Sequence, residues 1–159
     1  MKKLIFFTFF ILGISFYSFS QVDHDAIGLR LDAGYISGME VSYQKGFNSR
    51  NRLELDLGFG LNSQYHSLGV IGAFHWDWNI VHGLNWYVGP GAGIGFGIGR
   101  KGNDNFFNFA IGGQIGLEYD FNTLGVPILA SIDTRPMWNI FNDIDPFGWG
   151  LALGVRYTF

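Results

Sequence analysis

The segment YVGPGAGIGFGIGRKG, residues 87–102, places a glycine at every second position from Gly89 to Gly99. A dinucleotide-binding loop needs the spacing G-x-G-x-x-G between a strand and a helix. Counted from Gly91, the sixth position is Phe96, and no helix-forming run follows, so the segment does not match that loop. A repeat of two residues is the repeat of a β-strand, whose side chains point alternately to opposite faces. The segment therefore predicts a strand that is bare on one face and apolar on the other.

Seven further segments alternate in the same way, so the sequence predicts eight strands. In each segment, large apolar residues occupy one parity, and glycine, small or charged residues occupy most of the other. Pro90 interrupts the glycine-rich strand, because proline has no N–H to donate to the ladder, and a β-bulge at this position would reconcile it with a strand. The expected strands span residues 26–35, 39–44, 52–61, 67–78, 87–99, 107–121, 128–135 and 149–159.

The connectors between these strands are short turns at one end of the sheet and longer segments at the other. The turns cover residues 46–51, 79–85 and 122–126. The longest connector at the other end covers residues 136–148 and contains three aromatic residues, so it is the candidate for a surface loop.

The first twenty residues differ from the rest of the chain. A basic start, Met1-Lys2-Lys3, precedes an apolar run that ends with small residues before Gln21. This pattern is typical of a secretory signal peptide, and the run is shorter than the ~20 residues that a retained transmembrane helix needs. We therefore expect residues 1–20 to be a signal peptide and residues 21–159 to form one barrel domain. After residue 20 no stretch has the length and apolar character of a helical span.

Composition excludes several classes of function. The chain has no cysteine, so disulfides, thiolate metal sites and cysteine nucleophiles are absent from its chemistry. Only 14% of the residues are charged, against about 25% in average proteins. The formal net charge is −3, and it becomes −5 without Lys2 and Lys3. No basic patch is visible, so we do not expect nucleic acid as a partner.

Alternating strands of this kind fit two closed barrels, one soluble and one spanning a membrane. A membrane barrel has an apolar outer band and a polar lumen, and a soluble ligand-binding barrel has the reverse. Here the non-apolar face is mostly glycine, alanine and serine with isolated charges, which suits the narrow interior of eight strands better than a soluble exterior. The sequence therefore predicts an all-β fold, a closed antiparallel up-and-down transmembrane β-barrel. Aromatic residues expected as a membrane-interface belt near the short turns are Trp76, Trp78, Trp86, Tyr119, Phe121, Tyr157 and Phe159.

The end of the chain, LALGVRYTF, carries the most specific signal. Apolar and aromatic residues alternate there up to the last residue, and they are Leu151, Leu153, Val155, Tyr157 and Phe159. With the expected signal peptide and the strand rhythm, this segment resembles the small eight-stranded outer-membrane β-barrel proteins of Gram-negative bacteria, the porin-like and OmpA-transmembrane-domain type, over residues 21–159. The resemblance implies an outer-membrane location, contact with outer-membrane lipid, and reading of these five residues by the barrel-assembly machinery.

Charged residues at the inward parity form a candidate polar network in the lumen, since buried charges must pair or stay hydrated. We expect the glycines of residues 87–99 to make room for arginines from the opposite wall. Arg30 and Arg156 are expected to pair with Glu54, Glu118 or Asp77. The network comprises Arg30, Asp32, Glu40, Glu54, Asp56, Asp77, Glu118, Asp133, Arg135 and Arg156, and Asp120 shares their parity.

Barrel closure predicts a further pairing. A barrel in lipid leaves no backbone group unpaired only when its last strand pairs with its first. We therefore expect residues 149–159 to pair antiparallel with residues 26–35, with both chain ends on the periplasmic side.

Catalytic and metal sites have weak support. His75 and Asp77 lie two apart on one face, but the sequence offers no obvious third metal ligand. Tyr65, His66 and Ser67 alternate between faces, so a base and a nucleophile do not converge there. Asp143 and Asp145 lack the glycine and spacing of a calcium loop and read as a solvated loop. We expect no cofactor, no metal and no enzymatic activity.

The sequence thus favours a non-enzymatic, monomeric outer-membrane barrel with a mostly plugged polar lumen, acting as a scaffold, a stabiliser or a narrow pore. If water passes, the acidic excess of the lumen favours cations. Two alternatives stay open at this point. One is a surface adhesin or receptor that uses the loop of residues 136–148, and the other is a soluble barrel that carries an apolar ligand.

Overall fold

The structure is a computed structural model that describes residues 25–34, 38–61, 65–99, 105–141 and 147–159. The expected signal peptide lies outside the described residues. In the described part of the chain, no helix is long and apolar enough to cross a membrane. The elements are β1 (Ala26–Asp32), β2 (Gly38–Asn48), β3 (Asn51–Leu61), β4 (Tyr65–Val81), β5 (Leu84–Gly99), β6 (Phe106–Asp120), the short 3-10 helix η1 (Phe121–Leu124), β7 (Ile128–Thr134), β8 (Met137–Asn139), β9 (Phe147–Gly148) and β10 (Leu151–Thr158).

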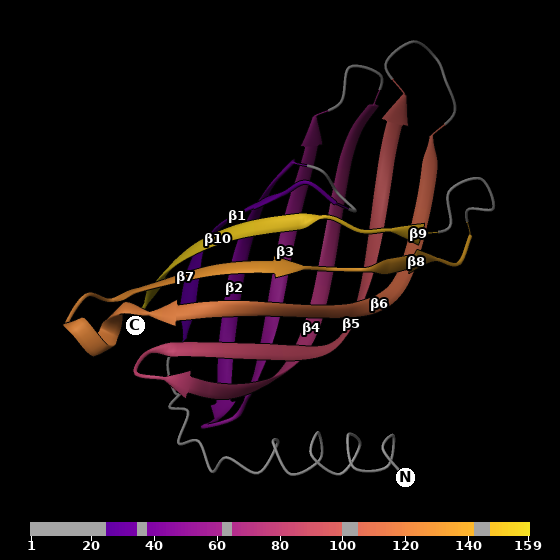
Figure 1. Cartoon of the computed structure of the whole chain (residues 1–159). Helices are drawn as coiled ribbons and strands as arrows, with labels where there is room; N and C mark the ends of the chain where they lie inside the picture. Colours follow the sequence, from indigo (N-terminus) through magenta and orange to yellow (C-terminus); the bar gives the residue numbers. More distant parts are fainter. Residues whose placement is uncertain (1–24, 35–37, 62–64, 100–104, 142–146) are drawn as a thin grey trace, which may run out of the picture.

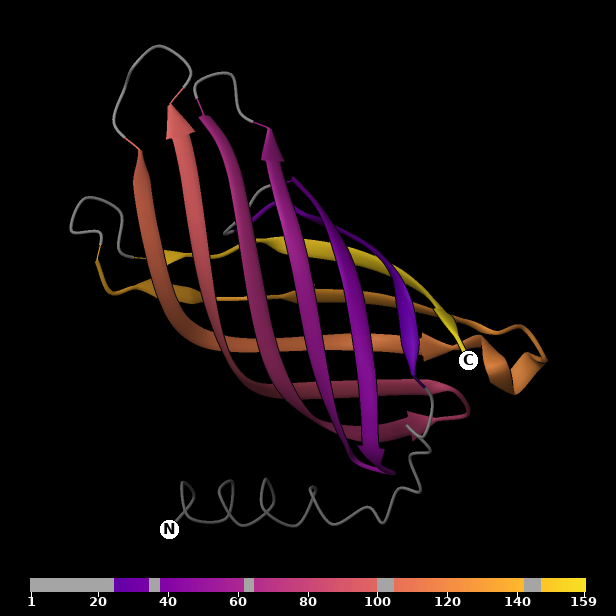
Figure 2. The same ribbon diagram turned by 180° about the vertical axis from the view of Figure 1, so that it is seen from behind.

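These strands form one closed antiparallel barrel (Figures 1 and 2). Sequential strands pair from β1 to β6, β6 pairs with β7 and β8, and β10 pairs with both β7 and β1. β7 and β8 keep one register against β6, so they are two parts of a single strand interrupted at Arg135 and Pro136. β9 and β10 keep one register against that strand in the same way. The eight-stranded up-and-down barrel predicted from the sequence is therefore confirmed.

The first and last strands close the barrel as expected. Their register runs from Ala26 opposite Thr158 to Asp32 opposite Ala152. Beyond it, the Ala33 N–H donates to the Leu151 carbonyl at 3.0 Å. The C-terminus lies at the end of the barrel that carries the β2–β3 and β4–β5 turns and η1, here called the turn end (Figures 1 and 2).

The strand accommodates Pro90 without a β-bulge. The β4–β5 register is the same on both sides of it, from Ala73 opposite Gly91 to Trp76 opposite Val88, and only the two intervening pairs are missing. Proline has no N–H to donate, so the ladder is interrupted without an inserted residue. A Cβ on the adjacent Gly89 would lie 1.6 Å from the Phe74 carbonyl oxygen, so glycine is required where these two strands approach so closely.

The interpretation of residues 136–148 as one long connector is also wrong. Most of its described residues extend the barrel wall as β8 and β9, which pair with each other through Met137 opposite Gly148 and Trp138 opposite Phe147. No alternation is visible across this segment, because Pro136 and the β9–β10 break at Trp149 and Gly150 divide it into short pieces. Residues 142–146, which include Asp143 and Asp145, lie outside the described residues.

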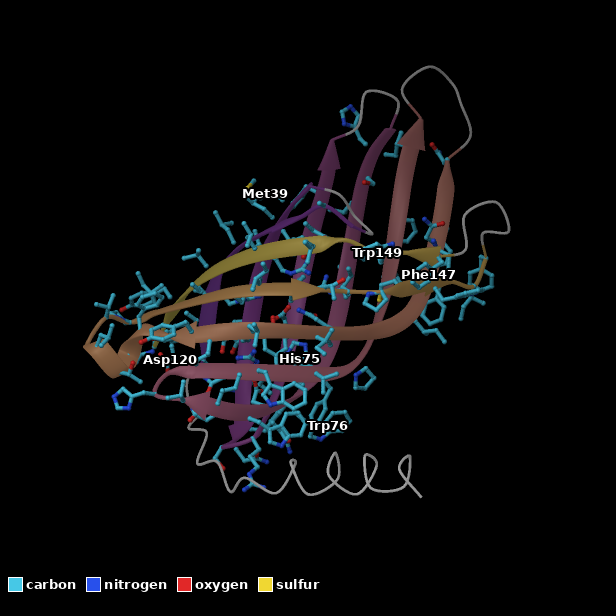
Figure 3. The ribbon with its side chains drawn as sticks, in the orientation of Figure 1. Met39, His75, Trp76, Asp120, Phe147 and Trp149 are labelled. Atoms are coloured by element: carbon cyan, nitrogen blue, oxygen red, sulfur yellow. The ribbon has the colours of Figure 1, made fainter. Side chains whose placement is uncertain are left out.

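The two faces of the barrel wall divide as the alternation predicts. Large apolar side chains such as Leu29, Leu55, Ile94 and Leu153 are exposed on the outside, and the buried side chains of the inside are mainly polar or charged. Figure 3 shows this at the adjacent β4 residues His75 and Trp76, of which only Trp76 is exposed.

Aromatic rings gather at both ends of the outer face. At the turn end, Trp78 stacks on Trp86 with ring centroids 4.5 Å apart, and Tyr119 meets Phe121 at 4.7 Å. The opposite end has a second group, which the sequence analysis did not identify. It comprises Phe96, Phe107, Phe109, Trp138, Phe141 and Phe147.

A cationic side chain placed halfway along the outer wall should destabilise the barrel in lipid. Leu55→Arg should lower the free energy of unfolding by about 2–4 kcal/mol, because the guanidinium would lie at the apolar midplane. The matched variant Phe47→Arg, near the turn end of β2, should cost no more than about 1 kcal/mol. Denaturant titrations of the barrel folded into lipid vesicles measure both values. An equal loss of unfolding free energy at the two positions would mean that Leu55 does not lie at the apolar midplane of the membrane.

Candidate functional site

The lumen contains all ten residues of the expected polar network, and each is at least nine-tenths buried. Asp120, which shares their parity, lies elsewhere. It is only half-buried at the turn end (Figure 3), where its carboxylate accepts the Asn122 N–H at 2.8 Å and caps η1. The lumen is the candidate functional site because it concentrates the charged groups of the barrel.

Arg30 on β1 binds carboxylates from two other strands. Its Nη1 donates to Glu40 Oε2 at 2.5 Å, and its Nη2 donates to Asp133 Oδ1 at 2.5 Å. Asp32 Oδ2 on the same strand lies 3.6 Å from Nη1. The pairing of Arg30 with Glu54, Glu118 or Asp77 that the inward parity predicts is wrong. Glu40 lies directly opposite Arg30 in the β1–β2 register, so the nearer carboxylate takes the arginine.

Arg135 binds side chains from three other strands. It occupies the interruption between β7 and β8, and its guanidinium reaches Glu40 on β2 at 3.3 Å and Glu54 on β3 at 3.2 Å. It also forms an ion pair with Asp56, and its Nε donates to Gln114 Oε1 on β6 at 3.1 Å. One guanidinium therefore connects four segments of the barrel wall across the lumen.

Glu54 is the acceptor at the centre of the network. Arg156 donates to its Oε2 at 3.0 Å, as expected from the sequence. Gln44 and Gln114 add further donors at 2.6 and 3.0 Å. Arg156 itself also donates to the hydroxyls of Ser42 and Ser131, each at 2.9 Å. A buried carboxylate with this many donors has its desolvation compensated by hydrogen bonds.

Arg52 is a functional residue that the sequence analysis missed. Its Nη1 donates to Glu118 Oε1 at 2.6 Å, and its Nη2 lies 3.3 Å from Asp77 Oδ1. The sequence predicts Arg30 or Arg156 as the partner of these two carboxylates, but Arg52 binds both of them. Arg52 is the first residue of the expected strand of residues 52–61 and has the same parity as Glu54 and Asp56, so the alternation alone could have identified it.

Two aromatic rings complete the cluster around Arg52. The guanidinium carbon lies 4.6 Å from the centroid of the Tyr87 ring, a cation–π distance. The His75 ring lies 4.7 Å from the Tyr87 ring, and Arg52 Nε donates to His75 Nδ1 at 3.5 Å. The Tyr87 hydroxyl donates to Asp133 Oδ2 at 3.1 Å, which joins the Arg52 cluster to the Arg30 cluster.

Glycines make room for these side chains at particular positions. A Cβ on Gly116 would lie 2.6 Å from the Tyr87 hydroxyl, and a Cβ on Gly154 would lie 2.8 Å from Arg156 Nη1. The glycine-rich inner face of β5 does not make room for an arginine at Gly93, contrary to the expectation from the sequence. The groups beside Gly93 are the side chains of Ile71 and Met137, not an arginine from the opposite wall.

An apolar cluster lies above the polar network, further from the turn end. Ile71, Ala110 and Met137 are fully buried and contact one another inside the barrel. Met137 is the next inward position after Arg135 on the β7–β8 strand, so the apolar cluster directly follows the ion pairs. The lumen therefore holds a dense network of ion pairs followed by an apolar layer, which is one cluster of side chains from β4, β6 and β8.

Other candidate sites do not assemble. Within the described residues, no three metal-ligating side chains converge, so His75 and Asp77 have no third ligand. His66 is exposed on the outer wall, and its neighbour Ser67 lies at the other parity. The five residues of the expected assembly signal line the outer face of the last strand and are exposed. They are Leu151, Leu153, Val155, Tyr157 and Phe159.

Comparison with known proteins identifies the fold. No protein-family model matches the chain, and no curated protein sequence matches it. The N-terminal β-barrel domain of OprF from Pseudomonas aeruginosa superposes with a TM-score of 0.68 at 16% identity, over 86% of this chain and 98% of that one. Neisserial surface protein A superposes with a TM-score of 0.58 at 15% identity, over 86% of this chain and 94% of that one. The chain therefore has the fold of small outer-membrane β-barrels.

Removing the central arginine should be costly. Arg135→Met should lower the free energy of unfolding by about 3–5 kcal/mol, because Glu40, Glu54 and Asp56 lose a shared cation inside a buried network. Lys45→Met makes the same change at an exposed ion pair with Asp25 at the turn end, where solvent screening leaves little to lose. Urea titrations of both variants in the same detergent measure the difference. A similar, small effect of both changes would contradict the assignment of Arg135 as the central residue.

Proposed function

We propose that this chain is an integral outer-membrane protein whose barrel is sealed and serves as a non-enzymatic scaffold or stabiliser of the membrane. The observation that carries the proposal is the filled lumen. Four buried arginines bind carboxylates across it, and an apolar layer of Ile71, Ala110 and Met137 follows. An interior that is filled by side chains leaves no continuous aqueous path of porin size.

The outer surface supports a location in lipid. Apolar side chains cover the outside between two aromatic groups, which is the arrangement of a membrane barrel with interfacial belts. The alternative of a soluble carrier does not fit this arrangement. Such a carrier needs an apolar interior for its ligand, and the interior of this barrel holds charged groups.

The adhesin or receptor alternative loses its main support. It required a long loop at residues 136–148, but Met137–Asn139 and Phe147–Gly148 belong to strands of the barrel wall. We therefore favour a role that the barrel itself performs. A narrow pore is the remaining variant of that role, and conductance measurements distinguish it from a sealed scaffold.

The last strand supports assembly by the outer-membrane route. Its outward residues alternate up to Phe159, they are exposed, and the strand closes the barrel against β1. We propose that the barrel-assembly machinery reads this strand, that outer-membrane lipid then surrounds a monomeric barrel, and that residues 1–20 direct secretion beforehand. Both ends of the barrel domain would then face the periplasm.

The sealed lumen predicts an electrical result. The protein reconstituted in planar bilayers should show no large steady conductance, only rare small openings. Met137→Ala should increase the frequency of these openings, because it thins the apolar layer, whereas Met39→Ala on the outer wall should leave it unchanged. Steady porin-sized currents from the unaltered protein would refute the sealed scaffold and require a wider barrel.

The assembly signal predicts a defect in insertion. The double variant Tyr157→Ser, Phe159→Ser should be secreted normally but recovered poorly in the outer-membrane fraction, because its backbone ladder is intact and only the outward side chains have changed. Immunoblots of separated membrane and periplasmic fractions measure this, with Thr158→Ser as the inward-facing control. Normal recovery of the double variant in the outer membrane would overturn the proposed role of these two residues.

A further inference from the structure

The charges enclosed by the barrel do not balance. In the part of the chain that the structure describes, the buried carboxylates outnumber the buried arginines by seven to four. An uncompensated charge is costly to bury, so the excess has to be neutralised inside the barrel. The arginines are Arg30, Arg52, Arg135 and Arg156, and the carboxylates belong to Asp32, Glu40, Glu54, Asp56, Asp77, Glu118 and Asp133.

His75 does not supply the missing positive charge. It is the histidine buried in the lumen, and its Nδ1 accepts a hydrogen bond from Arg52 Nε at 3.5 Å. An imidazole that accepts at Nδ1 carries its single proton on Nε2 and is neutral.

The carboxylate with the fewest partners lies beside Arg52. Asp77 is fully buried, yet among the described residues neither of its carboxylate oxygens has a hydrogen-bond partner, and its contact is the ion pair of Oδ1 with Arg52 at 3.3 Å. The other six buried carboxylates each accept at least one hydrogen bond. Glu118 binds the same guanidinium through Oε1, and no described residue donates to its Oε2. One guanidinium thus forms ion pairs with two carboxylates. Each carboxylate retains an oxygen that accepts no hydrogen bond from the described residues.

We propose that Asp77 and Glu118 bind a small monovalent cation, Na⁺ or K⁺, beside Arg52. Carboxylate oxygens are hard ligands that suit hard cations with part of their water shell retained. A divalent or transition metal fits less well, because no three metal-ligating side chains converge in the described part of the chain. One bound monovalent cation makes the charge of the Arg52 cluster zero.

The cation has a polar approach from the turn end. Asn79 and Asn85 lie between Asp77 and the β4–β5 turn and are joined by a hydrogen bond of 2.8 Å. Further from the turn end, the lumen holds the ion pairs of Arg30 and Arg135 and the buried cluster of Ile71, Ala110 and Met137. The side of Asn79 and Asn85 is therefore the polar approach to the site. This inference goes beyond the sealed scaffold and does not depend on where the barrel resides.

Salt exchange on the folded full-length barrel tests the proposal. The unfolding midpoint in detergent micelles should be higher in NaCl or KCl than in N-methyl-D-glucamine chloride at equal ionic strength and pH, and it should rise with the cation concentration. Asp77→Asn should abolish the difference between the salts. Asp32→Asn removes the same charge from the lumen further from the turn end, and it should keep the difference.

Sodium-23 NMR supplies a second readout that needs no unfolding. The protein should broaden the sodium line, K⁺ should reverse the broadening, and Asp77→Asn should reduce it at least two-fold. Identical unfolding midpoints in the three salts would overturn the proposal. An unfolding midpoint that changes with pH and not with the cation would also overturn it, because a proton would then neutralise the Arg52 cluster. Equal effects of Asp77→Asn and Asp32→Asn would overturn the assignment to Asp77. If Asp77→Asn does not fold, the salt comparison and K⁺ reversal on the unaltered protein decide.

Discussion

Backbone hydrogen bonding is the constraint on which the rest of this structure depends. A sheet whose outer surface is apolar has no water to satisfy an open edge, so its last strand must pair with its first. The β1–β10 ladder from Ala26 to Asp32 provides that closure. Once the ring is closed, the alternation of each strand assigns every side chain to the inside or the outside. The apolar exterior and the charged interior both follow from one geometric requirement.

Closure creates a second constraint, because eight strands enclose a space that only side chains can fill. This chain fills it with arginines and carboxylates from different walls, held together by glutamines and serines. Arg135 and Glu54 each contact several of these side chains and bind each other. Where a large side chain lies against the barrel wall, a glycine leaves the space for it, as Gly116 does for the Tyr87 ring. The interior is thus a specific arrangement of charges and not a diffuse polar lining.

The strand alternation was sufficient to predict the barrel, its closing pair and the inward side of ten charged residues, because parity depends only on the chain itself. It was insufficient for partner choice, which depends on register between strands: Arg30 takes Glu40 because the β1–β2 ladder sets them opposite each other. Arg52 was missed although it begins the expected strand of residues 52–61 and shares the parity of Glu54, so the alternation was sufficient to place it. The β7–β8 break at Arg135 and Pro136 hid the alternation across residues 136–148.

The contacts of Arg135 also bear on how the barrel folds. This residue binds Glu40, Glu54 and Asp56, which precede it by 95, 81 and 79 positions in the chain. Contacts between such distant positions form late, because the loop between them must first be closed. Until the β7–β8 strand arrives, three carboxylates face the interior without their common cation. A partly built barrel therefore gains little from its polar core, and this favours an all-or-none folding transition in which the core is completed together with the ring.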